Sequence, residues 1–429
     1  MLKKISMEQI RAGMYVHELG GSWLDNPFWA SSFILRDDAD LQKLRASGIE
    51  DLWIDTSKGA DVLEMDVAAA AAPEPEAEPE PTPAPVPPPP PSAPGHFRFE
   101  PQAPSGMREE LVRAAKVIHK SRDAVSSMFE DIRLGKLVDA AQATPIVEEI
   151  ANSVLRNAGA LLSLVRIKQA DDYTYLHSVA VSAMMIALAR QLNMSDAEVR
   201  DCGLAGLLHD IGKVAVPSTI LNKPGRLSDE EFQAVKGHPR AGHALLQEVP
   251  AISPAVLDVC LHHHERVDGN GYPDRLSGTD LSRVARMGAI CDVYDAITSN
   301  RPYKEGWSPA VSLRKMALWT KEGHLDEALF AAFVKCVGIY PVGTLVRLKS
   351  DRLAVVVDNG ETLLSPTVNA FYSVPSRVFL EPKLIDLARP DTIEKIVSVE
   401  EPQKWPIRNF DRFWLPENLP AHDRAPRAS

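Results

Sequence analysis

The segment Ser195-Asp-Ala-Glu198-Val-Arg-Asp-Cys-Gly-Leu-Ala-Gly-Leu-Leu-His209-Asp210-Ile-Gly-Lys213 decides the fold class of the central part of this chain. It opens with Ser195 three residues before Glu198, a spacing typical of the capping box at a helix start. An apolar run follows, and His209-Asp210 closes the predicted helix. An isolated His-Asp pair means little, so its significance depends on the segments around it.

Helical patterns continue on both sides of this segment. Further helix starts are predicted at Ser228-x-x-Glu231 and at Ser253-Pro254, and the hydrophobic period is helical from about 107 to 337. These patterns predict one all-helical domain over 107–340. Within it, the stretch 107–134 has apolar residues near heptad spacing, which indicates either a homodimer seam or a support for the domain: Leu111, Ala115, Ile118, Val125 and Met128.

The flanking regions differ in composition. Residues 73–94 contain 12 of the 34 prolines, so we expect 66–106 to be a disordered Pro/Ala/Glu-rich linker. Short alternating segments predict a small α/β module over 1–65, with a helical stretch near 37–47. The runs Thr344–Leu348, Leu353–Val357 and Thr362–Leu364 predict a small β appendage over 341–402, followed by a polar tail over 403–429.

Composition excludes several classes of protein. A 45% hydrophobic and 24% charged chain of 429 residues is typical of soluble globular proteins. Its formal charge of −11 opposes binding to polymeric nucleic acid, which requires a basic surface. The apolar run 179–189 is too short for a membrane span, which needs about 20 residues. The N-terminus lacks the pattern of a signal peptide, so we expect a cytoplasmic protein.

The cysteines do not indicate a clip or a disulfide framework, because they lie far apart in the sequence. We expect them to be buried apolar residues. The histidines are different, because seven of the twelve lie within 88 residues, which suggests a metal site: His177, His209, His238, His243, His262, His263 and His264.

Several of these side chains are predicted to face the protein interior. His177 shares a helical face with apolar residues, although alone it would more often be a core histidine. His263 and His264 end the helix that begins near Pro254, and adjacent inward imidazoles are costly without a partner. Asp292 lies on a face of small residues, where a buried acid needs a cation or a donor.

Together these groups form a set of ligands that suits Fe, Mn or Zn. With one bridging carboxylate, such a set can hold two ions about 3.5–4 Å apart, and two-metal sites commonly activate water to attack phosphate esters. Lys213, Arg301 and Lys304 supply positive charge for a phosphate.

The ordered motifs across about 170–305 resemble those of the HD-GYP domains, which are cyclic di-GMP phosphodiesterases within the His-Asp phosphohydrolase superfamily. The matching segments are Tyr173-Thr-Tyr-Leu-His177, Leu208-His209-Asp210-Ile-Gly-Lys213, Ile220-Leu-Asn-Lys-Pro-Gly225, His238-Pro239, His263-His264-Glu265, Asp268-Gly-Asn-Gly271-Tyr272-Pro273, Cys291-Asp292-Val-Tyr-Asp295 and Arg301-Pro302-Tyr303-Lys304. Residues 1–65 are similar to a small domain of unknown function often fused upstream. The resemblance implies a mainly α protein, in which an HD-type helical phosphohydrolase domain carries the two small flanking units.

The resemblance also implies roles for individual residues. Asp210 would bridge two divalent metal ions, with Fe or Mn favoured. The other ligands would be His177, His209 and Asp292 for one ion, and His238, His263 and His264 for the second. Lys213 would contact the scissile phosphate or the attacking hydroxide, and the nucleotide would contact Arg301, Lys304 and Tyr272.

Two further features follow from comparison with the family pattern. Some members have Glu four residues before the first histidine, where it helps to hold a third metal, whereas this chain has Tyr173, so we expect two ions. His243 and His262 are left without a ligand role and are expected to be outer-shell or surface groups.

The implied function is hydrolysis of cyclic di-GMP to linear pGpG, with GMP as a possible later product. Two alternatives are a cyclic di-GMP-responsive binding module without turnover and a metal phosphohydrolase that acts on another nucleotide. The Gly271-Tyr272-Pro273 loop is either a rigid turn beside the site or a docking surface for diguanylate cyclases.

Overall fold

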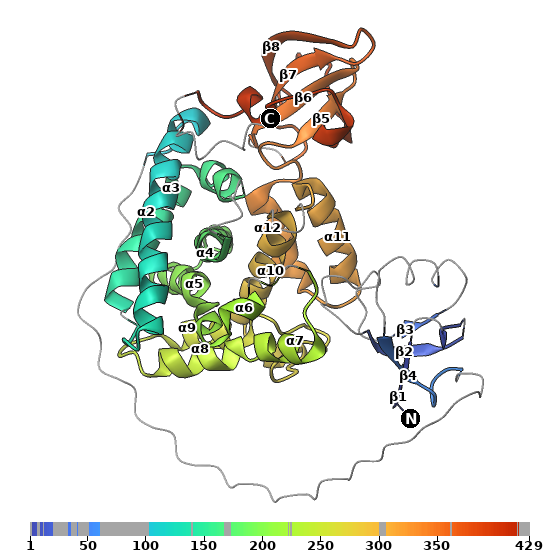
Figure 1. The fold of residues 1–429 in the computed structure, drawn as a ribbon. Coiled ribbons are helices and arrows are strands. Elements are labelled where there is room, and N and C mark those ends of the chain that lie inside the picture. The colour runs from blue at the N-terminus through green and yellow to red at the C-terminus, as the bar shows by residue number, and fades with distance from the viewer. Residues whose placement is uncertain are drawn as a thin grey trace, which may run out of the picture. The chain divides into compact units, whose positions relative to one another are not determined.

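The structure is a computed structural model that describes 103–417 and 419, apart from 139, 167–172, 222, 224, 300–305, 361–362 and 418. Near the N-terminus it also describes 2–6, 9–11, 13–19, 33–35, 41 and 51–60. The chain divides into two compact units, Met1–Phe97 and Arg98–Ser429 (Figure 1). No helix among the described residues combines the length and the apolar character needed to cross a membrane.

The N-terminal unit contains a four-stranded antiparallel sheet in the order β1-β4-β2-β3. Its strands are β1 (Leu2–Ser6), β2 (Tyr15–Leu19), β3 (Phe33–Ile34) and β4 (Asp51–Asp55). The sequence alternates over Met14-Tyr15-Val16-His17 and Leu52-Trp53-Ile54-Asp55, and strands β2 and β4 overlap these two segments. The buried residues of this unit form a small hydrophobic core: Ile5, Ile10, Met14, Val16, Leu35 and Ile54. The helix expected near 37–47 lies almost entirely outside the described residues.

The second unit begins with the helical domain, as the sequence predicts. Its helices are α2 (Met107–Arg133), α3 (Ala140–Val165), α4 (Tyr173–Gln191), α5 (Asp196–Leu208), α6 (Ser218–Leu221), α7 (Asp229–Lys236), α8 (His238–Gln247), α9 (Pro254–His262), α10 (Arg283–Thr298), α11 (Pro309–Lys321) and α12 (Glu327–Val337). The capping boxes at Ser195 and Ser228 are both present, with each serine and the glutamate three residues later bonding reciprocally.

Helix α4 is the centre of this domain. It contacts α3, α5, α10 and α12, and each residue from 177 to 189 is buried (Figure 1). The apolar run 179–189 is therefore the interior of the domain. Helix α5 approaches α4 closely at Gly206, where a Cβ atom would lie 2.8 Å from the backbone of Ser182. This close packing brings the end of α5 next to the start of α4.

Helix α2 packs along α3, and its heptad-spaced residues are buried within this chain. Leu111, Ala115, Ile118, Val125 and Met128 are each at most 6% exposed. This burial favours the interpretation of 107–134 as a support for the domain, and dimerisation remains a prediction.

The four cysteines are free thiols. Cys202, Cys260 and Cys291 are buried, as expected, whereas Cys336 is only partly buried.

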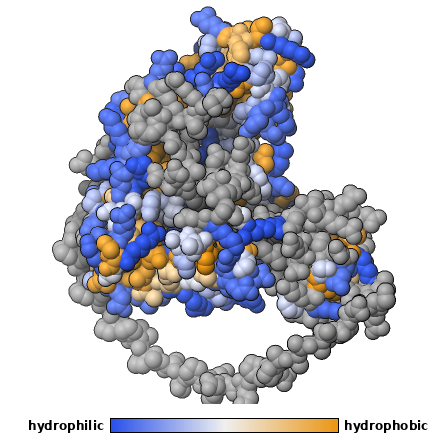
Figure 2. All heavy atoms as spheres, viewed as in Figure 1, coloured by the Kyte–Doolittle hydropathy of each residue, from blue (hydrophilic) through white to orange (hydrophobic). Residues whose placement is uncertain are grey.

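The C-terminal part of the second unit is an antiparallel sheet in the order β8-β7-β6-β5-β9. Its strands are β5 (Leu345–Leu348), β6 (Arg352–Asp358), β7 (Thr367–Ser373), β8 (Val378–Asp386) and β9 (Ile396–Val399). The expectation of a strand at Thr362–Leu364 is wrong, because Leu363 and Leu364 form a turn and β7 begins only at Thr367. Edge strand β8 is largely exposed, and Figure 2 shows hydrophobic surface on this part of the molecule.

The described residues from 403 to 417 do not form the polar tail expected over 403–429, of which 418 and 420–429 lie outside the described residues. The ring of Phe413 stacks on Phe371 of β7, with centroids 3.8 Å apart. The side-chain amide of Asn369 donates to the carbonyl oxygen of Phe413 at 2.8 Å, and Trp414 and Leu415 are also buried. These apolar side chains are sparse in the sequence but cover one face of the sheet.

Candidate metal centre

Seven side chains from five parts of the helical domain converge into two adjoining groups of potential metal ligands. One group comes from α4, from α10 and from the end of α5. The other comes from the start of α8, from the end of α9 and from the residue that follows His209. The first consists of His177, His209 and Asp292, and the second of Asp210, His238, His263 and His264. Within each group the ligand atoms lie within 4.8 Å of one another. These are the seven residues that the sequence singled out.

Asp210 lies between the two groups. Its Oδ2 atom is 3.4 Å from Nε2 of His177 and 3.4 Å from Nε2 of His209. Its Oδ1 atom is 3.2 Å from Nε2 of His238 and 3.7 Å from Nε2 of His263. One carboxylate thus presents one oxygen to each group, which is the geometry that a bridging ligand requires.

Asp292 also contacts both groups, although less symmetrically. Its Oδ1 atom lies 3.1 Å from Nε2 of His177, and its Oδ2 atom lies 3.5 Å from Nδ1 of His264. Burial alone would raise the pKa of Asp292, but the hydrogen bond to His177 and the nearby imidazoles hold that pKa well below its usual range. The carboxylate is therefore ionised at neutral pH.

Three imidazoles of the site are held neutral. Burial lowers the pKa of His264 to about 3 and also lowers the pKa values of His209 and His263. A neutral imidazole keeps the lone pair that a metal ion needs.

Backbone carbonyls fix the orientation of three rings. Nδ1 of His209 lies 2.8 Å from the carbonyl oxygen of Gly206, and Nδ1 of His238 lies 2.7 Å from that of Val235. Nδ1 of His263 lies 3.0 Å from the carbonyl oxygen of Val259. With Nδ1 as the donor in each case, Nε2 is left to act as the ligand atom.

His177 is oriented by a side chain that sequence reasoning missed. Its Nδ1 atom lies 2.6 Å from Oδ2 of Asp295, which is 3% exposed. Asp295 follows Asp292 by three residues on α10, so both carboxylates lie on the same side of the helix. That spacing was visible in the motif Cys291-Asp292-Val-Tyr-Asp295, but only the packing of α4 against α10 shows its partner.

The donor set fits divalent metal ions. Two ionised buried carboxylates face five imidazoles, three of which have lowered pKa values. Asp210 Oδ1 is buried and makes no hydrogen bond of good geometry among the described residues, a costly arrangement that a cation would relieve. Nitrogen and oxygen donors in these numbers suit Fe, Mn or Zn.

The remaining expected site residues differ in where the structure places them. Lys213 lies at the centre, where its ammonium group donates to Asp210 Oδ2 at 2.5 Å. Tyr272 packs its ring against His264, with centroids 4.8 Å apart. Arg301 and Lys304 lie outside the described residues, as does the side chain of Tyr173.

His262 is not among the clustered ligands, in agreement with the expectation of an outer-shell role. Its Nδ1 atom lies 2.7 Å from Asp258 Oδ1, and its Nε2 atom lies 3.2 Å from Asp274 Oδ2. Burial alone would lower the pKa of His262, but these two carboxylates raise it. His243 is likewise absent from both ligand groups.

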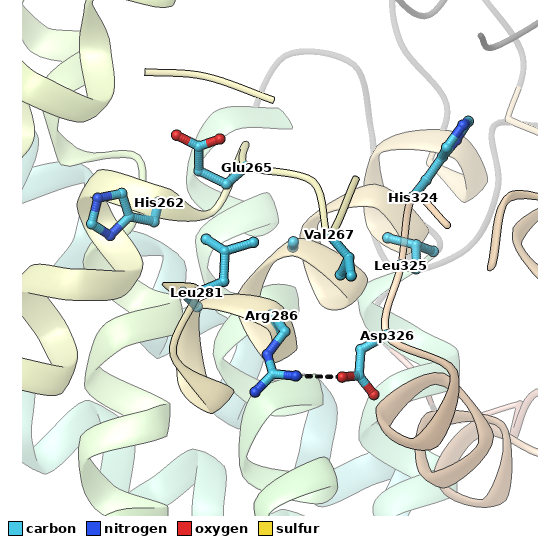
Figure 3. A pocket seen from close by; sticks show the side chains of 10 residues that line it. His262, Glu265, Val267, Leu281, Arg286, His324, Leu325 and Asp326 are labelled. Atoms are coloured by element: carbon cyan, nitrogen blue, oxygen red, sulfur yellow. Dashed lines mark hydrogen bonds and ion pairs between the residues drawn. The ribbon is translucent and has the colours of Figure 1, made fainter. Parts of the chain in front are cut away.

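A small cavity lies behind the histidine-rich end of α9 (Figure 3). Its volume is about 10 Å³, and its lining includes Glu265, His262 and the ion pair between Arg286 and Asp326. That volume is close to the minimum for a single water molecule, so the cavity is not a nucleotide site.

Comparison with known proteins agrees with this geometry. Residues 145–329 match the family model described as HD domain, and residues 2–143 match a domain of unknown function, DUF3391. The second match runs beyond the expected 1–65 module and includes α2.

Several relatives of this chain have named activities. The chain is 51% identical over 420 residues to the cyclic di-GMP phosphodiesterase PA4108 of Pseudomonas aeruginosa, covering 96% of each chain. It is 44% identical over 140 residues to the cyclic di-GMP phosphodiesterase response regulator RpfG of Xanthomonas campestris, covering 32% of this chain and 36% of that one. It is 34% identical over 165 residues to the 3'3'-cGAMP-specific phosphodiesterase 1 of Vibrio cholerae, covering 38% of each. The near full-length identity to the first relative, together with the match to the HD domain, shows that this chain belongs to the HD-GYP family of HD-domain proteins.

Proposed function

We propose that this chain is a metal-dependent phosphodiesterase that hydrolyses cyclic di-GMP to linear pGpG. The main structural support is Asp210, whose two carboxylate oxygens face two separate groups of imidazoles. The relative that is 51% identical over nearly the whole chain carries the name of a cyclic di-GMP phosphodiesterase.

Two divalent ions, with Fe or Mn favoured, would supply an activated water and stabilise negative charge on the phosphoryl oxygens. Asp210 would bridge them. Asp292 would complete the group of His177 and His209, and the remaining ligands would be His238, His263 and His264.

The other residues of the chain would orient the ligands and the substrate. Asp295 would keep Nδ1 of His177 protonated, so that Nε2 acts as the ligand atom. Lys213 lies close enough to Asp210 to place its ammonium group beside a phosphate at the centre. Arg301 and Lys304 would bind the second phosphate of the cyclic dinucleotide, because an arginine fork and a lysine point charge both suit a phosphate.

Tyr272 would contact a nucleotide base from its position beside His264. The alternative role of the Gly271-Tyr272-Pro273 loop, docking of diguanylate cyclases, remains a prediction. The inward packing of Tyr272 favours the role at the site.

The direct test is turnover of a nucleotide panel by metal-loaded protein purified without oxygen, with the products identified by mass spectrometry. Cyclic di-GMP, 3'3'-cGAMP and linear pGpG are the informative substrates. We expect cyclic di-GMP to be cleaved to pGpG with the highest kcat/KM. Binding of cyclic di-GMP without cleavage, in protein that retains its metals, would instead identify a signalling module.

A second candidate substrate is 3'3'-cGAMP, because a relative specific for it is 34% identical over 165 residues of this chain. The two substrates share both phosphodiester bonds and differ in one base. A higher kcat/KM for 3'3'-cGAMP would therefore keep the proposed chemistry and change the substrate.

A further inference from the structure

Glu265 carries a buried carboxylate that is not one of the potential metal ligands. It follows His263 and His264 directly and is 3% exposed, yet it belongs to neither ligand group. Its Oε1 atom accepts backbone N–H hydrogen bonds from Asp274 at 2.6 Å and from Arg275 at 2.8 Å. A side-chain oxygen that accepts two amide hydrogen bonds can hold a turn in place much as a capping residue holds a helix end.

The residues held in this way follow Tyr272-Pro273. On the other side of Tyr272, the loop crosses the chain at Glu265, where a Cβ atom added to Gly271 would lie 2.4 Å from the Cα atom of Glu265. The backbone N–H of Tyr272 donates to the carbonyl oxygen of His264 at 3.2 Å. Tyr272 is therefore fastened on both sides to the segment that carries His263 and His264.

Two further side chains support the same turn. His262 bridges Asp258 of α9 and the carboxylate of Asp274, and Arg240 of α8 forms an ion pair with the other oxygen of Asp274. His262 and Arg240 hold the side chain of Asp274, whereas Glu265 holds the backbone N–H groups of Asp274 and Arg275.

We propose that Glu265 is a positioning residue that sets the ring of Tyr272 against His264 by accepting the N–H groups of Asp274 and Arg275. The role depends on the reach of the side chain and not on its charge. Its second oxygen, Oε2, has no hydrogen-bond partner among the described residues. Glu265 is also one of the residues that line the small cavity of Figure 3, which is too small for a substrate. Glu265 consequently acts through Tyr272 and does not touch the reacting atoms.

Two conservative variants of the full-length protein separate reach from charge. Glu265→Gln keeps an oxygen at the same distance and removes the charge. Glu265→Asp keeps the charge and shortens the side chain by one methylene group, so that the carboxylate no longer reaches both amides. Hydrogen–deuterium exchange of a peptide covering 270–280 reports on those amides directly, with a peptide from 179–189 in α4 as the internal control.

We expect Glu265→Gln to keep amide protection and kcat/KM for cyclic di-GMP within about threefold of the wild type. Glu265→Asp should lower the protection of 270–280 and the value of kcat/KM by about tenfold or more each, since supporting residues typically contribute 10–100-fold. Protection of the α4 peptide should not change. The proposal would be overturned if Glu265→Asp were active and Glu265→Gln inactive. Equal protection of the 270–280 amides in the two variants would overturn it as well.

A double substitution tests the route through Tyr272. If Glu265 acts through this ring, Glu265→Asp should cause little further loss in a Tyr272→Ala background. The same tenfold loss in both backgrounds would contradict that route. The activity measurements rest on the proposed function, whereas the hydrogen–deuterium exchange measurement does not. If the wild-type protein did not hydrolyse cyclic di-GMP, the proposed function would be wrong, and the exchange measurement would still test the role of Glu265.

Discussion

Oδ2 of Asp295 lies 2.6 Å from Nδ1 of His177, although 118 residues separate them in the chain. Both side chains are buried, so this contact fixes the ring of the first histidine of the site from behind. It also joins α10 to α4 at the point where Asp292, one turn away, faces the other nitrogen of the same ring. A pair of carboxylates on one helix face thus holds His177 from both of its nitrogens.

Replacement of Asp295 should weaken the centre without removing a proposed ligand. Asp295→Asn preserves the shape but allows the amide to face His177 with its N–H₂ group, which no longer favours the required tautomer. We expect a 10–100-fold loss in metal affinity or turnover. Metal titration and steady-state kinetics would measure it, with Asp280→Asn, an exposed position at the end of the short 3-10 helix Gly278–Asp280, as the control. Wild-type values for both quantities would refute the orienting role.

Replacement of Asp210 should affect both metal ions, whereas replacement of a terminal ligand should affect one. Asp210→Asn removes the charge that both groups face, so elemental analysis should find both ions lost and turnover reduced by more than about a hundredfold. His238→Gln should leave one ion bound. Two retained ions in the Asp210 variant would eliminate the bridging assignment, and three in the wild type would contradict the expectation based on Tyr173.

Glu110 should contribute to stability far more than its neighbour Glu109. Glu110 is fully buried and accepts a two-pronged hydrogen bond from Arg156, with both distances 2.8 Å, as well as bonds from Ser153 and Ser105. We expect Glu110→Gln to lower the free energy of unfolding by about 1.5–3 kcal/mol in urea denaturation. Glu109→Gln, which loses only an exposed ion pair with Arg113, should cost less than about 1 kcal/mol.

The same residue predicts a pH dependence. Burial alone would raise the pKa of Glu110, but the hydrogen bonds from Arg156, Ser153 and Ser105 outweigh it and lower the pKa. A lowered carboxyl pKa stabilises the fold above the unfolded value of about 4.3, and this stabilisation is lost as the pH falls through the folded value. The stability difference between wild type and Glu110→Gln should therefore be full at pH 7 and shrink below about pH 4. A difference that grows in acid would show that another group dominates.

The helical domain should tolerate removal of the N-terminal unit but not of α2. A truncated chain beginning at Ala103 keeps Ser105 and the whole of α2, so it should remain monodisperse and retain its metals. A chain beginning at Ala140 exposes the apolar face of α3 that α2 covers, and it should aggregate or unfold at lower temperature. Size-exclusion chromatography and thermal melting would compare them. Failure of the longer chain to fold would show that the N-terminal unit is part of the domain.

Arg301 should affect substrate binding more than chemistry. Loss of a charge-assisted hydrogen bond worth about 1.5–3 kcal/mol predicts that Arg301→Ala raises KM for cyclic di-GMP by roughly tenfold or more, with metal content unchanged. Hydrolysis of a small generic diester, which has no second phosphate, should fall much less. Arg314→Ala, an exposed position on α11, is the control. Equal losses for both substrates would assign Arg301 to the fold or the metal site.

The sequence by itself determined the helical class of the central domain and the identity of the clustered side chains. Helix starts depend on local bonds, such as those between Ser195 and Glu198, so a spacing of three residues is enough to predict them. The resemblance of the ordered motifs to those of the HD-GYP domains likewise implied the full set of potential ligands.

Tertiary packing alone decided which distant groups meet. Asp295 finds His177 only because α10 packs on α4, and the N–H groups at Asp274 and Arg275 reach Glu265 only because the chain turns back after Gly271. The sequence pattern does not reveal the burial of Phe413 and Trp414 for the same reason, since these side chains are buried against a sheet formed elsewhere in the chain. The sequence pattern shows that a buried charge or ring needs a partner. Which partner it contacts depends on the packing of distant segments, which no local pattern encodes.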